Sequence, residues 1–300
     1  MFDKISVKLK DGNCNHEPLF FSDTEKIHFI INSTPNGNGD LEINEGDVVI
    51  YTDKFLYKID PNAKKNIALL IESPEYHRQY YDYISTNNNK FDLVLTFDRS
   101  LLDRGENFRV NLYGTCWLHD SYINLWPKSK LCSMVTSYKS CTSGHKFRHV
   151  ITNYLVGHYT NVDIYGGKYT KLPYMTSTPF TPEHSSRHIT NGKINALKEY
   201  MFSITIENYK QDYYFTEKLL DCFLTGTVPI YYGCPSIGNF FNCDGIIMID
   251  KLEDLSKILP SLDTKLYDDM QPYIEENYKR AQEYKTFIIN EKEILDKLEK

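Results

Sequence analysis

The strongest constraint on the fold is a series of short apolar runs separated by polar or amphipathic stretches. In the first half of the chain these runs cover residues 47–52, 66–71 and 91–97, with a possible fourth at 109–113, and residues 76–87 have a helical pattern. Short continuous apolar runs are typical of strands that are buried on both faces. Strands alternating with helices at this spacing predict a parallel sheet with helices on its faces.

The same pattern restarts after residues 126–130, which we interpret as a linker. The predicted elements of the second half are strands at 131–137, 161–165, 203–207, 228–232 and 245–249, helices at 145–156 and 216–225, and a helical tail over 268–300. Gly226 is a suitable stop for the second of these helices. Two successive units of this kind predict an α/β protein with two Rossmann-like domains facing a cleft, an N-terminal domain at 1–127 and a C-terminal domain at 128–300.

Charge and cysteine content exclude several classes of function. The net charge of −6 argues against a nucleic-acid partner, since phosphate backbones need a basic surface. No basic-then-apolar signal pattern opens the chain and no apolar run is long enough to cross a membrane, so we expect a cytoplasmic protein without a transmembrane segment. The seven cysteines form no CxxC pair, which argues against a zinc site and favours buried free thiols.

The most informative segment runs from residue 202 to residue 241. A predicted strand ends at Glu207-Asn208, and a polar loop then leads to Thr216, which is a good N-cap residue. Glu217 and Lys218 occupy the first helical turn, where free amides and a partial positive charge suit an anion such as a diphosphate. The alternative is that Lys218 is a solvated surface lysine and Glu217 only a partner of the helix dipole.

The order of these residues resembles the donor-site pattern of glycosyltransferase family ten, the α-1,3/4-fucosyltransferases. The matching positions are Glu207-Asn208, then Tyr214-Phe215-Thr216-Glu217-Lys218, then Gly226-Thr227-Val228-Pro229-Ile230. The resemblance implies a GT-B fold and a donor site for GDP-fucose. In that site Lys218 would contact the diphosphate, while Tyr214 and Glu217 would contact ribose, diphosphate or fucose.

The resemblance extends upstream of this segment. Residues 133–139 resemble the strand that opens the family's donor domain, and Arg148 matches an arginine that meets the diphosphate. Guanidinium groups suit forked contacts to phosphate. The alternative, an arginine on a helix surface, has about equal weight on chemistry alone.

Glu72 is the candidate catalytic base. It follows a hydrophobic strand, and a carboxylate there can take a proton from an attacking hydroxyl. On spacing alone, Glu72 as a cap of the next helix is the stronger interpretation. The resemblance favours the base because family members carry a similar acidic segment here, with Glu75 as the rival residue.

These motifs predict an inverting glycosyltransferase that transfers fucose from GDP-fucose to a glycan acceptor. The sequence contains no Asp-x-Asp motif, which fits a transferase that requires no metal and no cofactor. Two alternatives stay open: the same fold using another nucleotide sugar, and a non-catalytic carbohydrate-binding protein. A scaffold that uses the charged tail helix is a third, although the charges are explained more simply as a solvated face.

Overall fold

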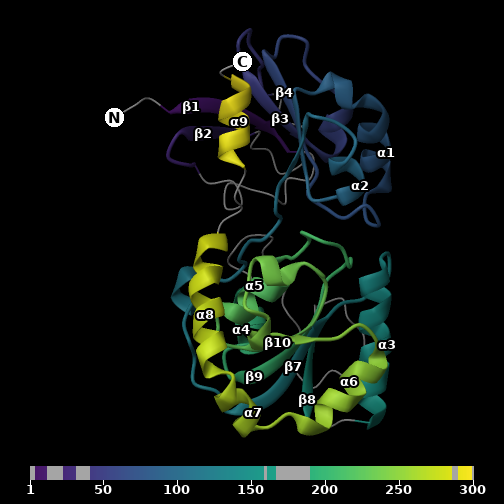
Figure 1. The fold of residues 1–300 in the computed structure, drawn as a ribbon, viewed down its shortest axis with the longest axis vertical. Helices are drawn as coiled ribbons and strands as arrows, with labels where there is room; N and C mark the ends of the chain where they lie inside the picture. The colour runs from purple at the N-terminus through teal and green to yellow at the C-terminus, as the bar shows by residue number, and fades with distance from the viewer. Residues whose placement is uncertain are drawn as a thin grey trace. The chain divides into compact units, whose positions relative to one another are not determined.

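The computed structural model describes residues 4–11, 23–31, 41–158, 161–166, 190–285 and 290–298. The chain forms two compact units, one of residues Met1–Tyr113 with Thr286–Lys300 and one of Gly114–Lys285 (Figure 1). The expected linker at 126–130 lies inside the second unit, and the C-terminal residues belong to the first. No helix among the described residues is both long enough and apolar enough to span a bilayer.

The first unit contains a parallel sheet in the order β2-β1-β3-β4-β5-β6. Its strands are β1 (Ile5–Lys10), β2 (Ile27–Ile31), β3 (Val48–Thr52), β4 (Lys65–Leu69), β5 (Leu93–Thr96) and β6 (Phe108–Val110). Its helices are α1 (Arg78–Asn87), α2 (Arg99–Leu102) and α9 (Glu291–Leu298). Every residue of β3 and of β5 is buried, as the continuous apolar runs predicted.

The helical tail predicted over 268–300 is wrong as a single element. The structure has α7 (Thr264–Asp269) and α8 (Gln271–Ala281) in the second unit, and α9 in the first. Pro272 lies in the first turn of α8, where its missing N–H costs nothing, so a new helix begins there. An ion pair of 2.9 Å between Arg109 and Glu293 holds α9 to the strand β6.

The second unit contains a parallel sheet in the order β11-β10-β9-β7-β8. Its strands are β7 (Lys130–Thr136), β8 (Val162–Gly166), β9 (Tyr200–Ile206), β10 (Val228–Tyr232) and β11 (Ile247–Met248). Besides α7 and α8, its helices are α3 (Ser143–His158), α4 (Thr190–Asn195), α5 (Glu217–Phe223) and α6 (Leu252–Ile258). In Figure 1, α3 and α8 lie on opposite sides of this unit.

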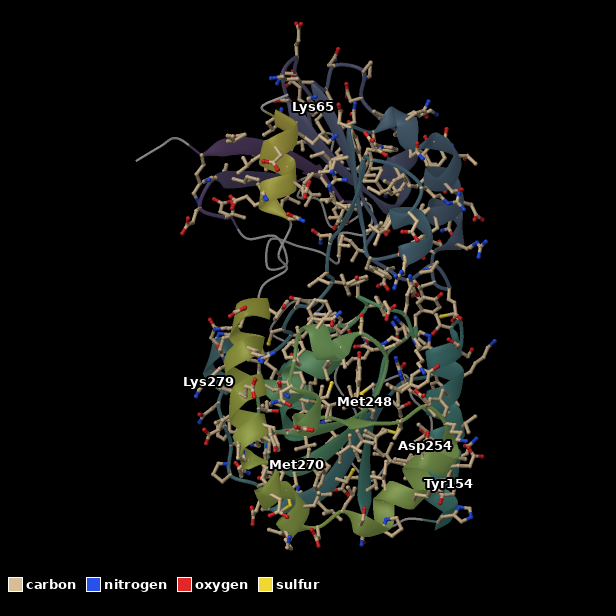
Figure 2. All side chains as sticks on the ribbon, in the orientation of Figure 1. Lys65, Tyr154, Met248, Asp254, Met270 and Lys279 are labelled. Atoms are coloured by element: carbon tan, nitrogen blue, oxygen red, sulfur yellow. The ribbon has the colours of Figure 1, made fainter. Side chains whose placement is uncertain are left out.

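Register aligns the core of the second unit across the sheet. Ile164, Met134, Ile204 and Ile230 are successive partners on four neighbouring strands, and all four are buried. Met270, between α7 and α8, joins the same apolar cluster (Figure 2). Because the strands are parallel, their carboxyl ends lie along one edge of the sheet, where ligands of such folds bind.

The cysteines are only partly as expected. Of those in the described residues, Cys116, Cys132, Cys222 and Cys234 are buried free thiols, whereas Cys141 and Cys243 are exposed. Cys14 lies outside the described residues.

Lys128, just before the strand β7, is a buried lysine whose Nζ forms hydrogen bonds with backbone carbonyls. Its Nζ lies within hydrogen-bonding distance of the carbonyls of Thr225 at 2.7 Å, Lys198 at 3.2 Å and Leu197 at 3.3 Å, and of Thr227 Oγ1 at 3.0 Å. Burial lowers the pKa of Lys128 to about 7. The folded protein therefore releases this proton more readily than the unfolded chain does.

We expect Lys128→Met to change how stability depends on pH. Between about pH 7 and pH 10 the unfolded wild type binds more protons at Lys128, so its free energy of unfolding rises with pH. The free energy of unfolding of the wild type minus that of the variant should therefore increase as the pH rises over this interval. Urea denaturation followed by tryptophan fluorescence measures it, because both tryptophans, Trp117 and Trp126, belong to the second unit.

Lys130→Met is the matched control for this measurement. Lys130 forms a half-exposed ion pair of 3.1 Å with Glu199, which raises its pKa, so its contribution stays constant until the pH exceeds the usual lysine value. If the free-energy difference between wild type and Lys128→Met depends on pH no more than the difference for Lys130→Met does, the assignment of a lowered pKa to Lys128 is contradicted.

Candidate functional site

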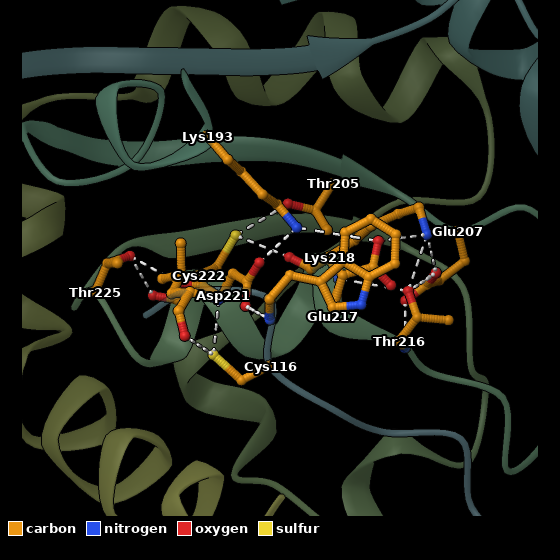
Figure 3. A network of polar contacts seen from close by, with 12 residues as sticks. Cys116, Lys193, Thr205, Glu207, Thr216, Glu217, Lys218, Asp221, Cys222 and Thr225 are labelled. Carbon is orange, nitrogen blue, oxygen red and sulfur yellow. Dashed lines mark hydrogen bonds and ion pairs between the residues drawn. The ribbon is translucent and has the colours of Figure 1, made fainter. Parts of the chain in front are cut away.

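A buried carboxylate joins the end of β9 to the start of α5. Glu207 is fully buried, and its Oε1 accepts from the Thr216 backbone N–H at 2.8 Å while its Oε2 accepts from the Thr216 hydroxyl at 2.7 Å (Figure 3). Thr216 is the N-cap of α5. Burial raises the pKa of Glu207, and nearby Lys218 opposes this. The predicted strand end and N-cap are therefore parts of one hydrogen-bonded unit.

Lys218 lies among oxygen atoms and is only 23% exposed at its side chain. Its Nζ lies 3.0 Å from Thr216 Oγ1, 3.2 Å from Glu217 Oε1 and 3.6 Å from Glu207 Oε2. The alternative of a solvated surface lysine is therefore wrong. Burial would raise the pKa of Glu217, but Lys218 and Lys193 lower it to about 2, so Glu217 is a carboxylate at neutral pH.

Arg148 comes from the helix α3 and is 6% exposed, so the alternative of a helix-surface arginine is wrong. Its Nε donates to the Ile206 carbonyl at 3.1 Å and its Nη2 donates to Asn208 Oδ1. Burial lowers the pKa of Arg148, while the carboxylates of Glu207 and Glu217 raise it. An arginine stays protonated under these influences.

Gly144 sets how closely α3 approaches the end of β9. Its N–H donates to the Asn208 carbonyl at 3.1 Å, and a Cβ at this position would lie 1.9 Å from the Glu207 carbonyl oxygen. His145 is buried beside it, and burial and the charge of Arg148 lower its pKa to about 3. His145 is therefore neutral, and Arg148 supplies the positive charge of this segment.

The loop before α5 carries backbone strain. Tyr213 has a φ of 65°, in the left-handed region, where a non-glycine residue costs about 1–2 kcal/mol. Its N–H donates to Ser236 Oγ at 3.1 Å, and the following residue, Tyr214, is fully buried. The turn thus directs Tyr214 inward immediately before the Thr216 N-cap. Such strain persists where the surroundings overdetermine the conformation, as they do in binding sites.

The structure adds a second buried ion pair that the sequence did not predict. Lys193 of α4 lies 2.5 Å from Asp221 and 4.0 Å from Glu217 (Figure 3). Asp221 is fully buried and also accepts from the Trp117 N–H at 3.0 Å. No local pattern marks a lysine and an aspartate on different helices as partners. Within the described residues, no group of three or more His, Cys, Asp or Glu side chains could hold a metal ion.

Glu72 lies in the first unit, three residues after β4 ends at Leu69. Its carbonyl accepts from the Tyr81 hydroxyl at 2.6 Å, and its side chain is neither buried nor fully exposed. The helix α1 begins at Arg78 with His77 as its N-cap, so Glu72 does not occupy the capping position. The rival residue, Glu75, is exposed.

Residues 125–293, more than half of the chain, match the family described as glycosyltransferase family 10 (fucosyltransferase) C-term. The chain belongs to glycosyltransferase family 10. The matched region contains Arg148, Glu207, Asn208, Tyr214 and the Thr216-Glu217-Lys218 segment. The resemblance inferred from these motifs is therefore confirmed at the level of the family.

Curated relatives match parts of the chain. A putative fucosyltransferase-like protein of Arabidopsis thaliana is 25% identical over 64% of this chain and 33% of its own length. An α-(1,3)-fucosyltransferase of Helicobacter pylori is 30% identical over 23% of this chain and 14% of its own length. A putative fucosyltransferase of Acanthamoeba polyphaga mimivirus is 26% identical over 77% and 35%. The chain thus spans about a third or less of these relatives.

Solved structures show the same fold. A crystal structure of α1,3-fucosyltransferase with GDP has a TM-score of 0.56 and 18% identity, covering 100% of this chain and 92% of that one. The corresponding complex with GDP-fucose has a TM-score of 0.56 and 17% identity, with coverages of 100% and 93%. An α-glucosyltransferase with UDP has a TM-score of 0.55 and 11% identity, with coverages of 99% and 100%. The predicted GT-B fold class is confirmed.

We expect Gly144→Ala to destabilise the second unit. The new methyl group would meet backbone atoms of Glu207 and Asn208, which cannot rotate away, so the free energy of unfolding should fall by about 3 kcal/mol. Gly157→Ala in the same helix is the control, because a Cβ there meets nothing within 4 Å. Helix propensity predicts that this control gains up to about 1 kcal/mol. Equal stability of the two variants in urea denaturation would contradict the close packing of α3 against Glu207.

Proposed function

We propose that this chain transfers fucose from GDP-fucose to a hydroxyl group of a glycan, with inversion at the anomeric carbon. One observation carries the proposal: Arg148 and Lys218 converge on the carboxyl end of β9, within the region that matches the fucosyltransferase family. Two solved structures of the same fold, both described as α1,3-fucosyltransferase, are complexes with GDP and with GDP-fucose. These complexes support GDP-fucose as the donor.

The donor residues fall into two groups by their present contacts. Lys218 and Arg148 bring the positive charge that a diphosphate needs, and Tyr214 and Glu217 lie beside them as candidates for the ribose or fucose hydroxyls. Glu207 and Thr216 already satisfy one another. In the proposal Glu207 and Thr216 hold the start of α5, and Asn208 holds Arg148 through its side-chain oxygen.

The proposed reaction is a single displacement. The acceptor hydroxyl attacks the anomeric carbon of fucose, the bond from that carbon to the diphosphate oxygen breaks, and GDP leaves with the electron pair. Glu72 takes the proton of the hydroxyl, a role that contributes roughly 10²–10⁴-fold to rate in such enzymes. Lys218 and Arg148 stabilise the negative charge that develops on the leaving diphosphate. In this scheme the two side chains do the work that a divalent metal does elsewhere, and no metal is required.

Two other functions are distinguishable. A different nucleotide sugar is compatible with the fold, since the α-glucosyltransferase with UDP shares it. A non-catalytic carbohydrate-binding protein would need neither a charged diphosphate site nor a base. The buried Arg148 and the ion-paired Lys218 favour a transferase over this second alternative.

We expect the protein to bind GDP-fucose in the presence of EDTA, with higher affinity than GDP-mannose, UDP-galactose or UDP-glucose. Lys218→Ala should raise the Kd for GDP-fucose about 10–100-fold, since a charge-assisted hydrogen bond contributes roughly 1.5–3 kcal/mol. Isothermal titration calorimetry measures both effects. Lys265→Ala is the control, because Lys265 is 80% exposed on α7 and its removal changes the net charge equally.

The outcomes of this titration separate the alternatives. Preference for another nucleotide sugar would keep the fold and replace fucose. Binding that appears only after manganese is added would contradict metal independence. Absence of binding by every donor would favour the non-catalytic carbohydrate-binding protein.

We expect Glu72→Gln to lower the turnover number by roughly 10²–10⁴-fold while the Kd for GDP-fucose changes little, because the amide cannot accept the proton. Fucose transfer to N-acetyllactosamine-type acceptors, followed by product quantification, gives the turnover. Glu75→Gln is the companion variant on the same segment. A collapse of turnover in Glu75→Gln with normal turnover in Glu72→Gln would assign the base to Glu75.

A further inference from the structure

Three cations of the described residues lie at the candidate donor site: Arg148, Lys218 and Lys193. Lys193 is the one that no sequence pattern indicated. It lies on α4, and its side chain is 15% exposed. Its Nζ is 2.5 Å from Asp221, 4.0 Å from Glu217 and 5.5 Å from the centre of the Trp117 ring (Figure 3). Lys193 thus lies between two carboxylates of α5: Glu217, which also pairs with Lys218, and Asp221.

Among the described residues, Lys218 and Lys193 lie 3.2 Å and 4.0 Å from Glu217, and the two lysines differ in their other contacts and in exposure. Lys218 also contacts Thr216 and Glu207 and is the more exposed of the two, at 23% against 15%. A diphosphate attracts Lys218 more strongly than a single carboxylate does, because it offers several charged oxygens. Among the described residues, engagement of Lys218 by the donor would leave Lys193 as the cation still ion-paired with Glu217.

We propose that Lys193 is a positioning residue for fucose transfer: it remains the counter-ion of Glu217, which keeps that carboxylate charged and in place when Lys218 engages the donor's diphosphate. This inference rests on the proposed donor function. Lys193 itself touches no substrate in this scheme and acts through Glu217. A buried carboxylate without a cation would take up a proton, and a neutral Glu217 would lose its capacity to accept charge-assisted hydrogen bonds from donor hydroxyls.

Asp221 explains why a lysine with so little exposed surface is tolerated at this place. The Asp221 carboxylate pairs with Lys193 and accepts from the Trp117 N–H, so the cation is balanced even without Glu217. Burial lowers the pKa of Lys193, but Asp221 and Glu217 more than offset it and raise the pKa overall. Lys193 therefore keeps its charge throughout the neutral pH range.

The charges around Glu217 give the direction of the expected pH effect. Lys218 and Lys193 lower its pKa, and they overcome burial. Arg148 also attracts it, whereas Glu207 and Asp221 repel a second negative charge. When the donor engages Lys218 and Lys193 is absent, burial and the neighbouring Glu207 carboxylate remain, so the pKa of Glu217 is higher in the complex than in the free protein, where Lys218 still faces it. Binding then takes up a proton, so donor affinity is weakest at high pH and rises as the pH decreases through that raised value.

The test compares the pH dependence of GDP-fucose affinity in four proteins. Lys193→Met alone leaves Asp221 buried without its cation, so the double variant Lys193→Met/Asp221→Asn removes both charges and preserves folding. Asp221→Asn keeps Lys193 beside Glu217 and keeps an oxygen acceptor for Trp117. Lys193→Arg keeps the positive charge. Calorimetric titrations from about pH 8 to pH 5 give the Kd, and circular dichroism confirms the fold.

We expect wild type, Lys193→Arg and Asp221→Asn to bind GDP-fucose with nearly constant affinity over this interval. The double variant should bind more weakly than wild type at pH 8 and should gain affinity, by at most about ten-fold per pH unit, as the pH falls through the raised pKa of Glu217 in the complex. Adding Glu217→Gln to the double variant should abolish that pH dependence, since no carboxylate then titrates. A purely structural role for Lys193 predicts instead an equal loss of affinity at every pH.

Two results would overturn the inference. One is a double variant whose affinity profile follows that of wild type. The other is the same profile change in Asp221→Asn alone, which would mean that Lys193 acts through the Trp117 segment. Failure of the wild-type protein to bind GDP-fucose at any pH would instead contradict the proposed function, and the two failures are therefore distinguishable.

Discussion

The candidate donor site depends on the hydrogen bonds between the buried Glu207 carboxylate and Thr216. A carboxylate removed from water is costly unless its oxygens are satisfied, and here the backbone N–H and the hydroxyl of one residue satisfy both. The start of α5 is thereby fixed to the end of β9. Glycine fits at position 233 because a Cβ there would lie 2.3 Å from the Tyr231 hydroxyl oxygen and 2.6 Å from Cγ of Glu207. Everything that α5 presents in its first turn, including Lys218, takes its position from this link.

Charge balance is the second constraint on the site. Three cations, Arg148, Lys193 and Lys218, come from the helices α3, α4 and α5, and they face the carboxylates of Glu207, Glu217 and Asp221. Electrostatic interactions are strong in so enclosed a place, which favours equal numbers of the two signs. Lys218 is the most exposed of these cations, and it is therefore the one best placed to exchange a carboxylate for a ligand's phosphate.

The sequence predicted those parts of the structure that have local causes. The buried strands of both sheets follow from apolar runs, and the stop at Gly226 follows from its φ of 70°. The strands β1 and β2 escaped prediction because their apolar runs are interrupted, by the partly buried Lys8 and Lys10 in β1 and by the exposed His28 in β2. The ion pair between Lys193 and Asp221 also escaped, since only the tertiary fold brings α4 beside α5. The motif residues Arg148, Glu207 and Lys218 were predicted together, and the structure brings them together.

The family match and the proposed chemistry divide the chain in a consistent way. The match begins at residue 125, so it contains Arg148 and Lys218 and excludes Glu72. Binding a diphosphate and stabilising it as a leaving group imposes the same charges and spacing on any enzyme that uses such a donor. Taking a proton from an acceptor hydroxyl imposes only a carboxylate at the right distance, on a segment shaped by the acceptor. The family's sequence pattern is therefore expected to be recognisable in the segments proposed to bind the donor, and less recognisable in those proposed to bind the acceptor.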